Sequence, residues 1–343
     1  MSHENKTRVR PVLGFDIGGT QIKAAAVDAG GKILAAGRAP TPSSLPEFCK
    51  AVTQLIQDLH WRESGISGIG IGCKGIISPV TTEVLALPGG LHYLEGRLLS
   101  EIMTPLLEGA YPVAADNDAR VALEGERRWG AARGRQNVLM LTLGTGVGGA
   151  ILVDGKILRG TSGAAGHAGH LTVDSEGVEC ICGNRGCLET VFSARAIESA
   201  AFAAIHRGVS TELHKLTSRP PTCAEVFECA RQGDPVATDI VQHAIRFLGG
   251  AVAGLLHVLD PEIVILGGQI AESGDLLFNM IQRELDWRTK TLLRRSVPVV
   301  KSEVADPSGV LGAAALAFDA VALRTPPTPG IPPWHARSVY HDQ

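Results

Sequence analysis

The sequence predicts an α/β fold with two related lobes, and three observations support this prediction. Short apolar runs typical of buried strands alternate with longer stretches whose apolar residues recur at helical spacing. One glycine-rich pattern occurs twice along the chain. At 343 residues, 45% of them hydrophobic, the chain is also longer than the roughly 250–300 residues at which a single core stops growing.

Four short apolar runs are predicted to be buried strands, namely residues 12–15, 66–71, 138–143 and 263–266. Residues 240–259 carry apolar side chains at helical spacing and are predicted to form a helix. That helix should end before Pro261, because proline lacks the N–H that a helix interior needs. The five prolines and one glycine of residues 325–334 predict an irregular coil.

The repeated pattern covers residues 13–34 and 141–158. Each copy reads as a strand, a glycine-rich turn, a second strand, a tight turn and a short strand that begins with Lys-Ile-Leu. The first glycine-rich turn is Asp-Ile-Gly-Gly-Thr, and the second is Gly-Thr-Gly-Val-Gly-Gly. We therefore predict a duplication in which each lobe presents a glycine-rich turn to a shared cleft.

The first of these turns contains Asp16, Gly18, Gly19 and Thr20. Glycine lets backbone N–H groups approach phosphate oxygens without hindrance from a side chain. A carboxylate at Asp16 can hold a Mg²⁺-bound nucleotide, and Thr20 can donate to a phosphoryl oxygen. The alternative is an ordinary hairpin with an aspartate in its turn.

The second turn contains Gly144, Gly146 and Gly149, which satisfy the G-x-G-x-x-G pattern of dinucleotide-binding proteins. That fingerprint must open a helix, whereas residues 150–155 continue as a strand into a turn. We therefore favour a phosphate-binding hairpin over a dinucleotide site.

Residues 116–126 begin with Asp116, Asn117 and Asp118, which are strong helix-capping residues, and continue in a helical pattern. Asp118 would lie in the first turn, where the helix dipole favours its ionised form. An ionised carboxylate facing a cleft can accept a proton from a substrate hydroxyl, as phosphoryl transfer requires. The alternative is that these residues only cap a helix.

His170, Cys180, Cys182 and Cys187 offer one imidazole and three thiolates, the ligand set of a closed tetrahedral zinc site. The run is too short and too rich in glycine to form a helix or strand, so a bound metal would make it rigid. The cysteine count is seven, an odd number with three clustered, which favours a reduced cytoplasmic protein over a disulfide framework. The other cysteines are predicted to be small buried hydrophobes: Cys49, Cys73, Cys223 and Cys229.

Charge and hydropathy argue against several classes of function. The net charge is −3 and no Lys/Arg-rich run occurs, so we expect no nucleic-acid partner. No stretch reaches the ~20 apolar residues of a membrane span, and the first ten residues are too polar for a signal peptide. We therefore expect a cytoplasmic protein.

Taken together, these motifs resemble those of the ROK family of repressors, open reading frames and sugar kinases. The resemblance runs from Asp16 to about Ala320, and its motifs come in the expected order. The motifs are Asp-Ile-Gly-Gly-Thr at 16–20, Asn-Asp-Ala at 117–119, Leu-Gly-Thr-Gly-Val-Gly-Gly at 143–149, Gly-His-Ala-Gly-His at 166–170, the cysteine cluster, and Leu-Asp-Pro-Glu at 259–262 leading to Gly267-Gly268.

The resemblance implies a two-lobed actin/hexokinase-like (ribonuclease H-like) α/β fold with a zinc-binding loop in the larger lobe. The smaller lobe would comprise residues 1–117 and a returning helix at about 309–323. Residues 118–308 would form the larger lobe, and 324–343 a proline-rich tail. The implied activity is transfer of the γ-phosphoryl group of ATP, with Mg²⁺ and a structural Zn²⁺, to the 6-hydroxyl of a hexose or N-acetylhexosamine. Glucose and N-acetylmannosamine are the leading substrates, and a homodimer or homotetramer is typical of the family.

The resemblance also implies roles for individual residues. Asp118 would be the catalytic base. Sugar ligands would be Gly75, Asn117, His167, His170 and Glu189, and His170 would bind zinc as well. Contacts to ATP and Mg²⁺ would come from Asp16, Gly18, Gly19, Thr20, Thr145 and Gly146, and contacts to the nucleoside from Gly267 and Gly268.

Two positions depart from the family pattern. His167 stands where the family usually has glutamate, as in some bacterial N-acetylmannosamine kinases, and an imidazole can donate a hydrogen bond where a carboxylate cannot. The alternative is a tolerated variant with no effect on substrate. Lys74 stands in Gly-Cys-Lys-Gly, where a Pro-Gly pair is common. It could reach a substrate group, although a solvated side chain is favoured.

Two other functions are open within the same family. A sugar-responsive regulator would carry a winged helix-turn-helix ahead of the first phosphate motif, and the fifteen residues before Asp16 are too few for one. A catalytically silent sugar-binding protein is disfavoured by the presence of Asp16, Asp118 and both glycine-rich turns. We therefore expect an enzyme.

Overall fold

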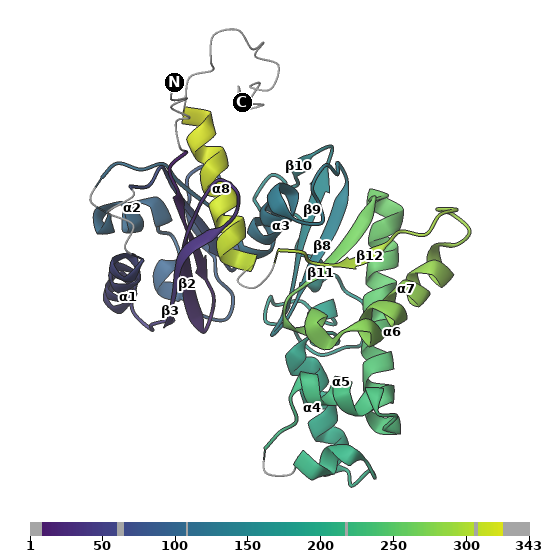
Figure 1. The fold of residues 1–343 in the computed structure, drawn as a ribbon. Coiled ribbons are helices and arrows are strands. Elements are labelled where there is room, and N and C mark those ends of the chain that lie inside the picture. The colour runs from purple at the N-terminus through teal and green to yellow at the C-terminus, as the bar shows by residue number, and fades with distance from the viewer. Residues whose placement is uncertain (1–8, 60–64, 108, 217–218, 305–307, 325–343) are drawn as a thin grey trace, which may run out of the picture.

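The protein is described from a computed structural model, in residues 9–59, 65–107, 109–216, 219–304 and 308–324. Two five-stranded sheets lie on either side of a pair of helices, α3 and α8 (Figure 1). The predicted proline-rich coil at residues 325–334 lies outside the described residues. Within these residues, no helix is both long enough and apolar enough to cross a membrane.

The first sheet has the strand order β3-β2-β1-β4-β7. β1 pairs antiparallel with β2 and parallel with β4, β2 pairs antiparallel with β3, and β4 pairs parallel with β7. The strands are β1 (Val12–Ile17), β2 (Gln21–Val27), β3 (Ile33–Pro40), β4 (Ile69–Cys73) and β7 (Val113–Asn117). A separate two-stranded sheet joins β5 (Ile76–Ile77) and β6 (Val84–Ala86).

The second sheet has the order β10-β9-β8-β11-β12 and repeats the same directions strand for strand. Its strands are β8 (Val138–Leu143), β9 (Val147–Val153), β10 (Lys156–Ile157), β11 (Ile263–Gly267) and β12 (Val299–Lys301). The duplication predicted from the two glycine-rich patterns is thereby confirmed, because each pattern forms the antiparallel half of an equivalent sheet.

Helices cover both faces of each sheet. On the first sheet, α1 (Leu45–Asp58) and α2 (Leu99–Met103) pack on one face and α8 (Ser308–Arg324) on the other. On the second sheet, α3 (Asp118–Trp129) packs on one face. The other face meets α4 (Ala194–His206), α5 (Cys223–Arg231), α6 (Pro235–Leu259) and α7 (Asp275–Thr289).

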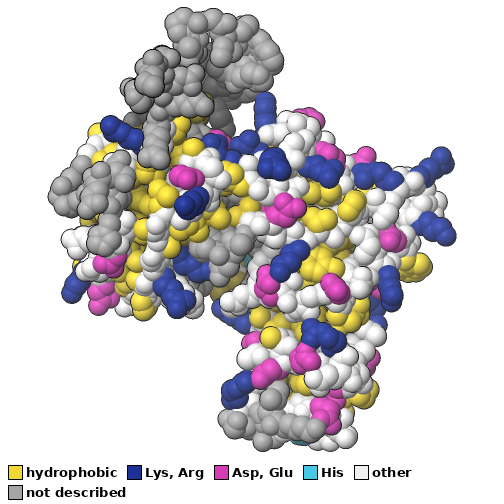
Figure 2. Space-filling model, viewed as in Figure 1, with side chains coloured by type: hydrophobic (Ala, Val, Ile, Leu, Met, Phe, Trp, Pro, Cys, Tyr) yellow, Lys and Arg dark blue, Asp and Glu magenta, His cyan; other side chains and the backbone are white. Residues whose placement is uncertain are grey.

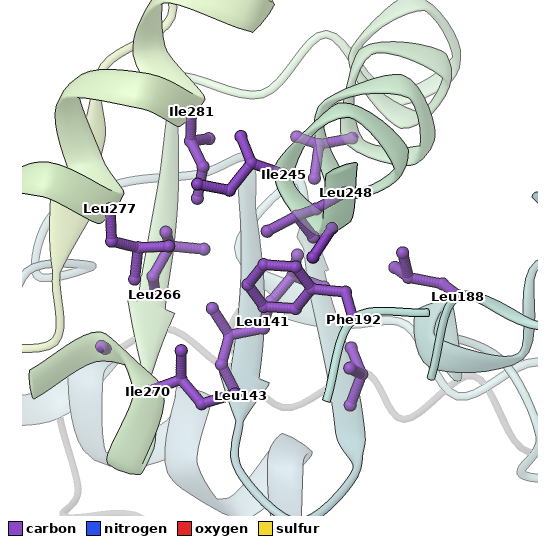
Figure 3. Packing of buried hydrophobic residues seen from close by; sticks show 14 of the residues in the cluster. Leu141, Leu143, Leu188, Phe192, Ile245, Leu248, Leu266, Ile270, Leu277 and Ile281 are labelled. Carbon is purple, nitrogen blue, oxygen red and sulfur yellow. The ribbon is translucent and has the colours of Figure 1, made fainter. Parts of the chain in front are cut away.

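The largest core lies between the second sheet and α6 and α7. Buried side chains of β8, β11, α6 and α7 gather between these elements in one cluster that includes Phe192 (Figure 3). This core holds α6 against the sheet, as the helical spacing of its apolar residues predicts. The helix begins five residues before the predicted start, because the Asp234 side chain caps it by accepting from the Ala237 N–H at 2.7 Å.

Close approach of α8 to the first sheet depends on two glycines. A Cβ at Gly14 would overlap the carbonyl of Val310, and one at Gly70 would overlap the carbonyl of Ala313. The helix therefore lies directly on β1 and β4, and it includes Arg324, which the sequence had placed in the tail. Of the predicted strands, three begin where expected, whereas β4 begins at Ile69 and extends to Cys73.

The cysteines outside the cluster follow their prediction in part. Cys73 and Cys223 are buried, whereas Cys49 and Cys229 are half-buried at the edges of the hydrophobic cores. Acidic and basic side chains are interspersed on the face shown in Figure 2.

Candidate active site

The central strands of the first sheet bring three predicted motifs to one edge. β1, β4 and β7 are parallel neighbours, and their register aligns Asp16 with Gly72 and Gly72 with Asp116. The carboxyl ends of such strands form the usual ligand-binding edge of an α/β sheet. The first glycine-rich turn, residues 74–75 and residues 117–118 therefore lie next to one another.

Asn117 is the N-cap of α3. Its Oδ1 accepts from the N–H groups of Ala119 at 3.0 Å and Arg120 at 3.4 Å. Its Nδ2 donates to the carbonyl of Gly75 at 2.9 Å. The capping prediction is confirmed, and the same side chain joins the end of β7 to the turn that follows β4. The roles of Asn117 and Gly75 as sugar ligands stay predictions.

Asp118 lies in the first turn of α3, half-buried, and its Oδ1 accepts from the Ala119 N–H at 2.9 Å. Burial raises the pKa of Asp118, and this effect exceeds the opposing effects of the Ala119 N–H, His167, Asn117 and Lys74. The N–H of the first helical turn favours the ionised form, as expected, but burial opposes it and sets the net direction. Desolvation of the carboxylate is the larger influence.

The first glycine-rich turn joins β1 to β2 and leaves Gly19 and Thr20 exposed. It closes through a hydrogen bond from the Gly18 N–H to the Gln21 carbonyl at 3.0 Å, and the hydroxyl of Thr41 donates to the Gly18 carbonyl at 2.8 Å. The Asp16 carboxylate lies against Gly309 in the first turn of α8, where a Cβ would overlap it.

The second glycine-rich turn is a hairpin between β8 and β9, as predicted, because β9 continues as a strand from Val147. Within it the Gly144 N–H donates to the Gly146 carbonyl at 3.0 Å, and Thr145 is exposed. Gly268, with φ +86°, lies against the backbone of Leu143, where a Cβ would clash. Gly267 and Gly268 therefore adjoin the second turn at the end of β11.

Glu189 joins the cysteine-rich loop to the second glycine-rich turn. Its Oε2 accepts from the Val147 N–H at 2.8 Å. A Cβ at Gly146 would overlap this carboxylate, so a side chain there would force Glu189 to move. The structure thus places a predicted sugar ligand beside a predicted nucleotide contact.

His167 and His170 stack with their ring centroids 6.3 Å apart and an interplanar angle of 12°. The His167 Nδ1 lies 3.0 Å from the Ala164 carbonyl, which can only accept, so Nδ1 carries a proton. Burial lowers the pKa of His167, which favours the neutral ring. Its Nε2 is then an acceptor, and no hydrogen-bond partner for this buried atom occurs among the described residues. From the sequence, we expect the His167 ring to donate a hydrogen bond to the substrate. In the structure its N–H at Nδ1 donates to the Ala164 carbonyl of the protein.

A buried ion-pair network holds the loop that leads to His167, and sequence reasoning missed it. Arg120 is fully buried and pairs with Asp116 at 3.0 Å. It also donates to the carbonyls of Gly163 and Ala165. Arg159 reaches the second oxygen of Asp116 at 2.8 Å. The only signal in the sequence was the i, i+4 spacing of Asp116 and Arg120, which also occurs on exposed helix faces.

The predicted metal ligands converge in a loop outside regular strands. The ligand atoms of His170, Cys180, Cys182 and Cys187 all lie within 4.8 Å of one another. The Cys180 Sγ is 3.6 Å from the His170 Nδ1, and the Cys182 Sγ is 3.7 Å from the Cys187 Sγ. With Zn–S of about 2.3 Å and Zn–N of about 2.0–2.1 Å, a tetrahedral ion separates sulfur from nitrogen by about 3.6 Å and two sulfurs by about 3.8 Å. The donors therefore fit zinc.

This loop also contacts the segment that follows β6 of the two-stranded sheet. The Ile181 side chain lies over Gly89, where a Cβ would overlap its Cδ1. Gly89 belongs to the loop that follows β6, so the candidate metal loop contacts the opposite side of the site.

Comparison with known proteins gives a consistent result. Residues 12–320 match the ROK family. A glucokinase of Halalkalibacterium halodurans is 34% identical over 283 residues, covering 80% of this chain and 84% of the glucokinase. An N-acetylmannosamine kinase of Yersinia pseudotuberculosis is 31% identical over 88% of this chain and 96% of its own length. A xylose repressor of Bacillus subtilis is 26% identical over 90% of this chain and 77% of the repressor.

Solved structures agree with this assignment. A ROK family glucokinase from Streptomyces griseus in complex with glucose and AMPPNP superposes with a TM-score of 0.79 at 31% identity. It covers 90% of this chain and 99% of the glucokinase. The predicted fold class, an actin/hexokinase-like α/β fold, is confirmed by this likeness. The chain belongs to the ROK family.

Proposed function

We propose that the protein is an ATP-dependent sugar kinase that phosphorylates the 6-hydroxyl of a hexose or N-acetylhexosamine. The observation that carries this proposal is the position of Asp118. Its half-buried carboxylate stands at the start of α3, beside His167 and at the same sheet edge as the Asp16 turn. In this proposal residues 1–117 with the helix at 309–323 form one lobe, and 118–308 form the other.

In the proposed reaction, the Asp118 carboxylate accepts the proton of the sugar 6-hydroxyl. A bond forms between that oxygen and the γ-phosphorus, while the bond from the γ-phosphorus to the bridging oxygen of ADP breaks. The raised pKa of Asp118 supports this role, because a base whose pKa approaches the working pH accepts a proton more readily. Positioning and charge stabilisation account for most of the remaining rate enhancement.

The sugar is proposed to bind against Asn117, Gly75, His167, His170 and Glu189. The free acceptor at the His167 Nε2 can receive a sugar hydroxyl or an amide N–H. The glutamate that the family usually has at this position would also accept a hydrogen bond. Histidine therefore changes the shape and charge of the pocket, whereas the position remains a hydrogen-bond acceptor. Glucose and N-acetylmannosamine are the first substrates to test, because relatives named for both are more than 30% identical to this chain.

ATP is proposed to bind along the two glycine-rich turns, which belong to different sheets. The first glycine-rich turn would contact the phosphates through Asp16, Gly18, Gly19 and Thr20. The second turn would contact them through Thr145 and Gly146. Gly267 and Gly268 would lie beside the nucleoside. Mg²⁺, held through Asp16, would neutralise charge on the β- and γ-phosphates.

Zinc is proposed to hold the sugar side of the pocket. Its ligand His170 stacks on His167, and the last cysteine of the cluster is two residues before Glu189. A metal at this site would fix both predicted sugar ligands in place without taking part in the chemistry.

A coupled ADP-release assay across glucose, mannose, their N-acetylated amines, fructose and allose tests the proposal. We expect ATP-dependent turnover with at least one of these sugars. No turnover with any of them, at saturating ATP and Mg²⁺, would contradict the kinase assignment.

A sugar-responsive regulator is the second candidate, because the chain is also similar to a xylose repressor. Such a protein, like a silent sugar-binding protein, would bind a sugar in calorimetry without releasing ADP. The two measurements together separate a kinase from both of these alternatives.

A further inference from the structure

We propose that Lys74 is a further catalytic residue, whose ammonium group contacts the phosphoryl group during its transfer. The proposal rests on the kinase activity proposed above. It goes beyond that activity because the position was expected to hold a solvated side chain.

The strand order places Lys74 between the two reacting partners. Lys74 directly follows β4, which lies between β1 and β7. The first glycine-rich turn extends from β1 on one side, and Asp118 follows β7 on the other. A phosphoryl group that moves from ATP on that turn to a sugar hydroxyl at Asp118 must therefore pass the end of β4.

The contacts of the side chain point into this space. Its Nζ lies 3.8 Å from the position that a Cβ on Gly19 would occupy, and 3.6 Å from the corresponding position on Gly90. Lys74 is half-buried, and its contact with the Pro88 carbonyl is exposed. An amine between the glycine-rich turn and the Gly90 loop can reach a phosphate bound on Gly19.

The hydrogen bonding of Lys74 leaves its donors available. Its ammonium has three N–H donors, and the described contact is a long one, 3.5 Å to the Pro88 carbonyl. Such a contact holds the side chain loosely in place and can be exchanged for a phosphate oxygen at normal distance.

The charges around Lys74 also fit this role. The ammonium acts on Asp118, where it favours the ionised carboxylate, and on the Cys73 thiol, where it opposes the effect of burial. The transferred phosphoryl group carries its charge on three equatorial oxygens. A lysine binds phosphate as a compact point charge. The ammonium of Lys74 can therefore favour the ionised form of Asp118 and also attract the phosphoryl group during its transfer.

The test compares Lys74→Met and Lys74→Arg with a matched control, Lys156→Met. Lys156 is an exposed lysine on β10, at the edge of the second sheet. Removal of one preorganised charge donor lowers kcat by about 10²–10³-fold, so we expect a loss of that size in Lys74→Met. Lys74→Arg should restore part of it, and Lys156→Met should match the wild type. Dissociation constants for the sugar and for ADP should stay within about threefold.

A transition-state mimic gives the second readout. ADP with aluminium fluoride and the preferred sugar should form a tight complex with the wild type and a much weaker one with Lys74→Met, whereas ADP alone should bind both equally. An unchanged kcat in Lys74→Met overturns the proposal, and so does a raised sugar KM with unchanged kcat, which would make Lys74 a sugar ligand. If the wild type turns over and Lys74→Met gives one of these two results, only the role of Lys74 is contradicted. If the wild type itself does not turn over, the proposed kinase function is contradicted.

Discussion

Asp118 shows how opposing local influences set the chemistry of one side chain. The Ala119 N–H and the nearby Lys74 favour its charged form, whereas burial at the sheet edge disfavours it and determines the net direction of the pKa. A carboxylate with a raised pKa holds a proton more strongly than an ordinary aspartate. It is therefore better suited to accept one from a hydroxyl near neutral pH.

Asp118→Asn should lower kcat by several orders of magnitude while the sugar dissociation constant changes little, because the amide keeps the shape and loses the base. In the wild type, activity should fall as pH drops through the raised pKa, since only the ionised carboxylate accepts a proton. That acidic limb should lie above the value of about 3.9 for an ordinary aspartate. Steady-state kinetics and calorimetry check both points. Near-normal turnover in the variant would contradict the role of Asp118.

His167→Glu should change the ratio of kcat/KM between glucose and N-acetylmannosamine by about tenfold or more. The Nε2 acceptor would be replaced by a charged carboxylate of different shape, and a lost or unpaired hydrogen bond at a buried site costs about 1–3 kcal/mol. Competition between the two sugars in one assay measures the ratio directly. An unchanged ratio would mean that His167 does not select the substrate.

Within the described residues, the cysteine-rich loop lacks a continuous strand. In the part of the chain that the structure describes, it contributes only isolated bridges, Thr172 with Cys187 and Glu179 with Arg185, and no continuous strand. Backbone hydrogen bonds of turns hold the loop, for example from the Cys180 N–H to the Asn184 carbonyl at 2.7 Å and from the Leu188 N–H to the Leu171 carbonyl at 2.8 Å, and a bound metal would be a further constraint. The geometry of the four donors supplies a site for that constraint.

Cys182→Ser should release zinc and raise the sugar KM by about 10–100-fold, the usual effect of disturbing groups that orient a site. Cys229→Ser is the matched control, because Cys229 is half-buried far along the chain from the cluster. Elemental analysis of the purified protein should find one zinc per chain in the wild type and the control. A wild type without bound metal would refute the zinc site.

The two halves of the molecule are joined where α3 and α8 pack against each other between the two sheets. Gly312 of α8 approaches Val121 of α3 so closely that a Cβ would overlap its carbonyl. Asp319 pairs with Arg127 at 2.6 Å and with Arg128 at 3.1 Å. These helices join parts of the chain that belong to different sheets, so the site depends on how they pack (Figure 1).

Arg120→Met should lower the free energy of unfolding by about 3–5 kcal/mol, because it leaves the buried Asp116 carboxylate with less compensation. Arg120 ties β7 of the first sheet to the loop at 163–165, which follows the second sheet's hairpin. Arg135→Met, which removes an exposed pair with Glu262, should change it by less than about 1 kcal/mol. Chemical denaturation of both variants measures the difference. Equal effects would contradict a linking role for Arg120.

Much of the fold follows from patterns within short segments. The strands at 12–15 and 138–143, the end of α6 before Pro261 and the helix that starts after Asn117 all depend on local preferences, and each was predicted. The start of α6 was not, because Asp234 caps it ahead of the first strongly apolar turn. The Arg120 network was missed for a different reason: whether a charged side chain is buried depends on which loop packs over it.

The family, the duplication and the candidate metal and phosphate motifs could all be predicted from the amino-acid sequence, because each depends on a local spacing of residues. The way in which those motifs meet depends on the folded arrangement of the two sheets. Folding directs the His167 N–H to Ala164, buries Asp118 so that its pKa rises, and places Lys74 between the first glycine-rich turn and Asp118. The physical reason is that burial, partner choice and charge environment arise from segments far apart in the chain, which a sequence pattern does not bring together.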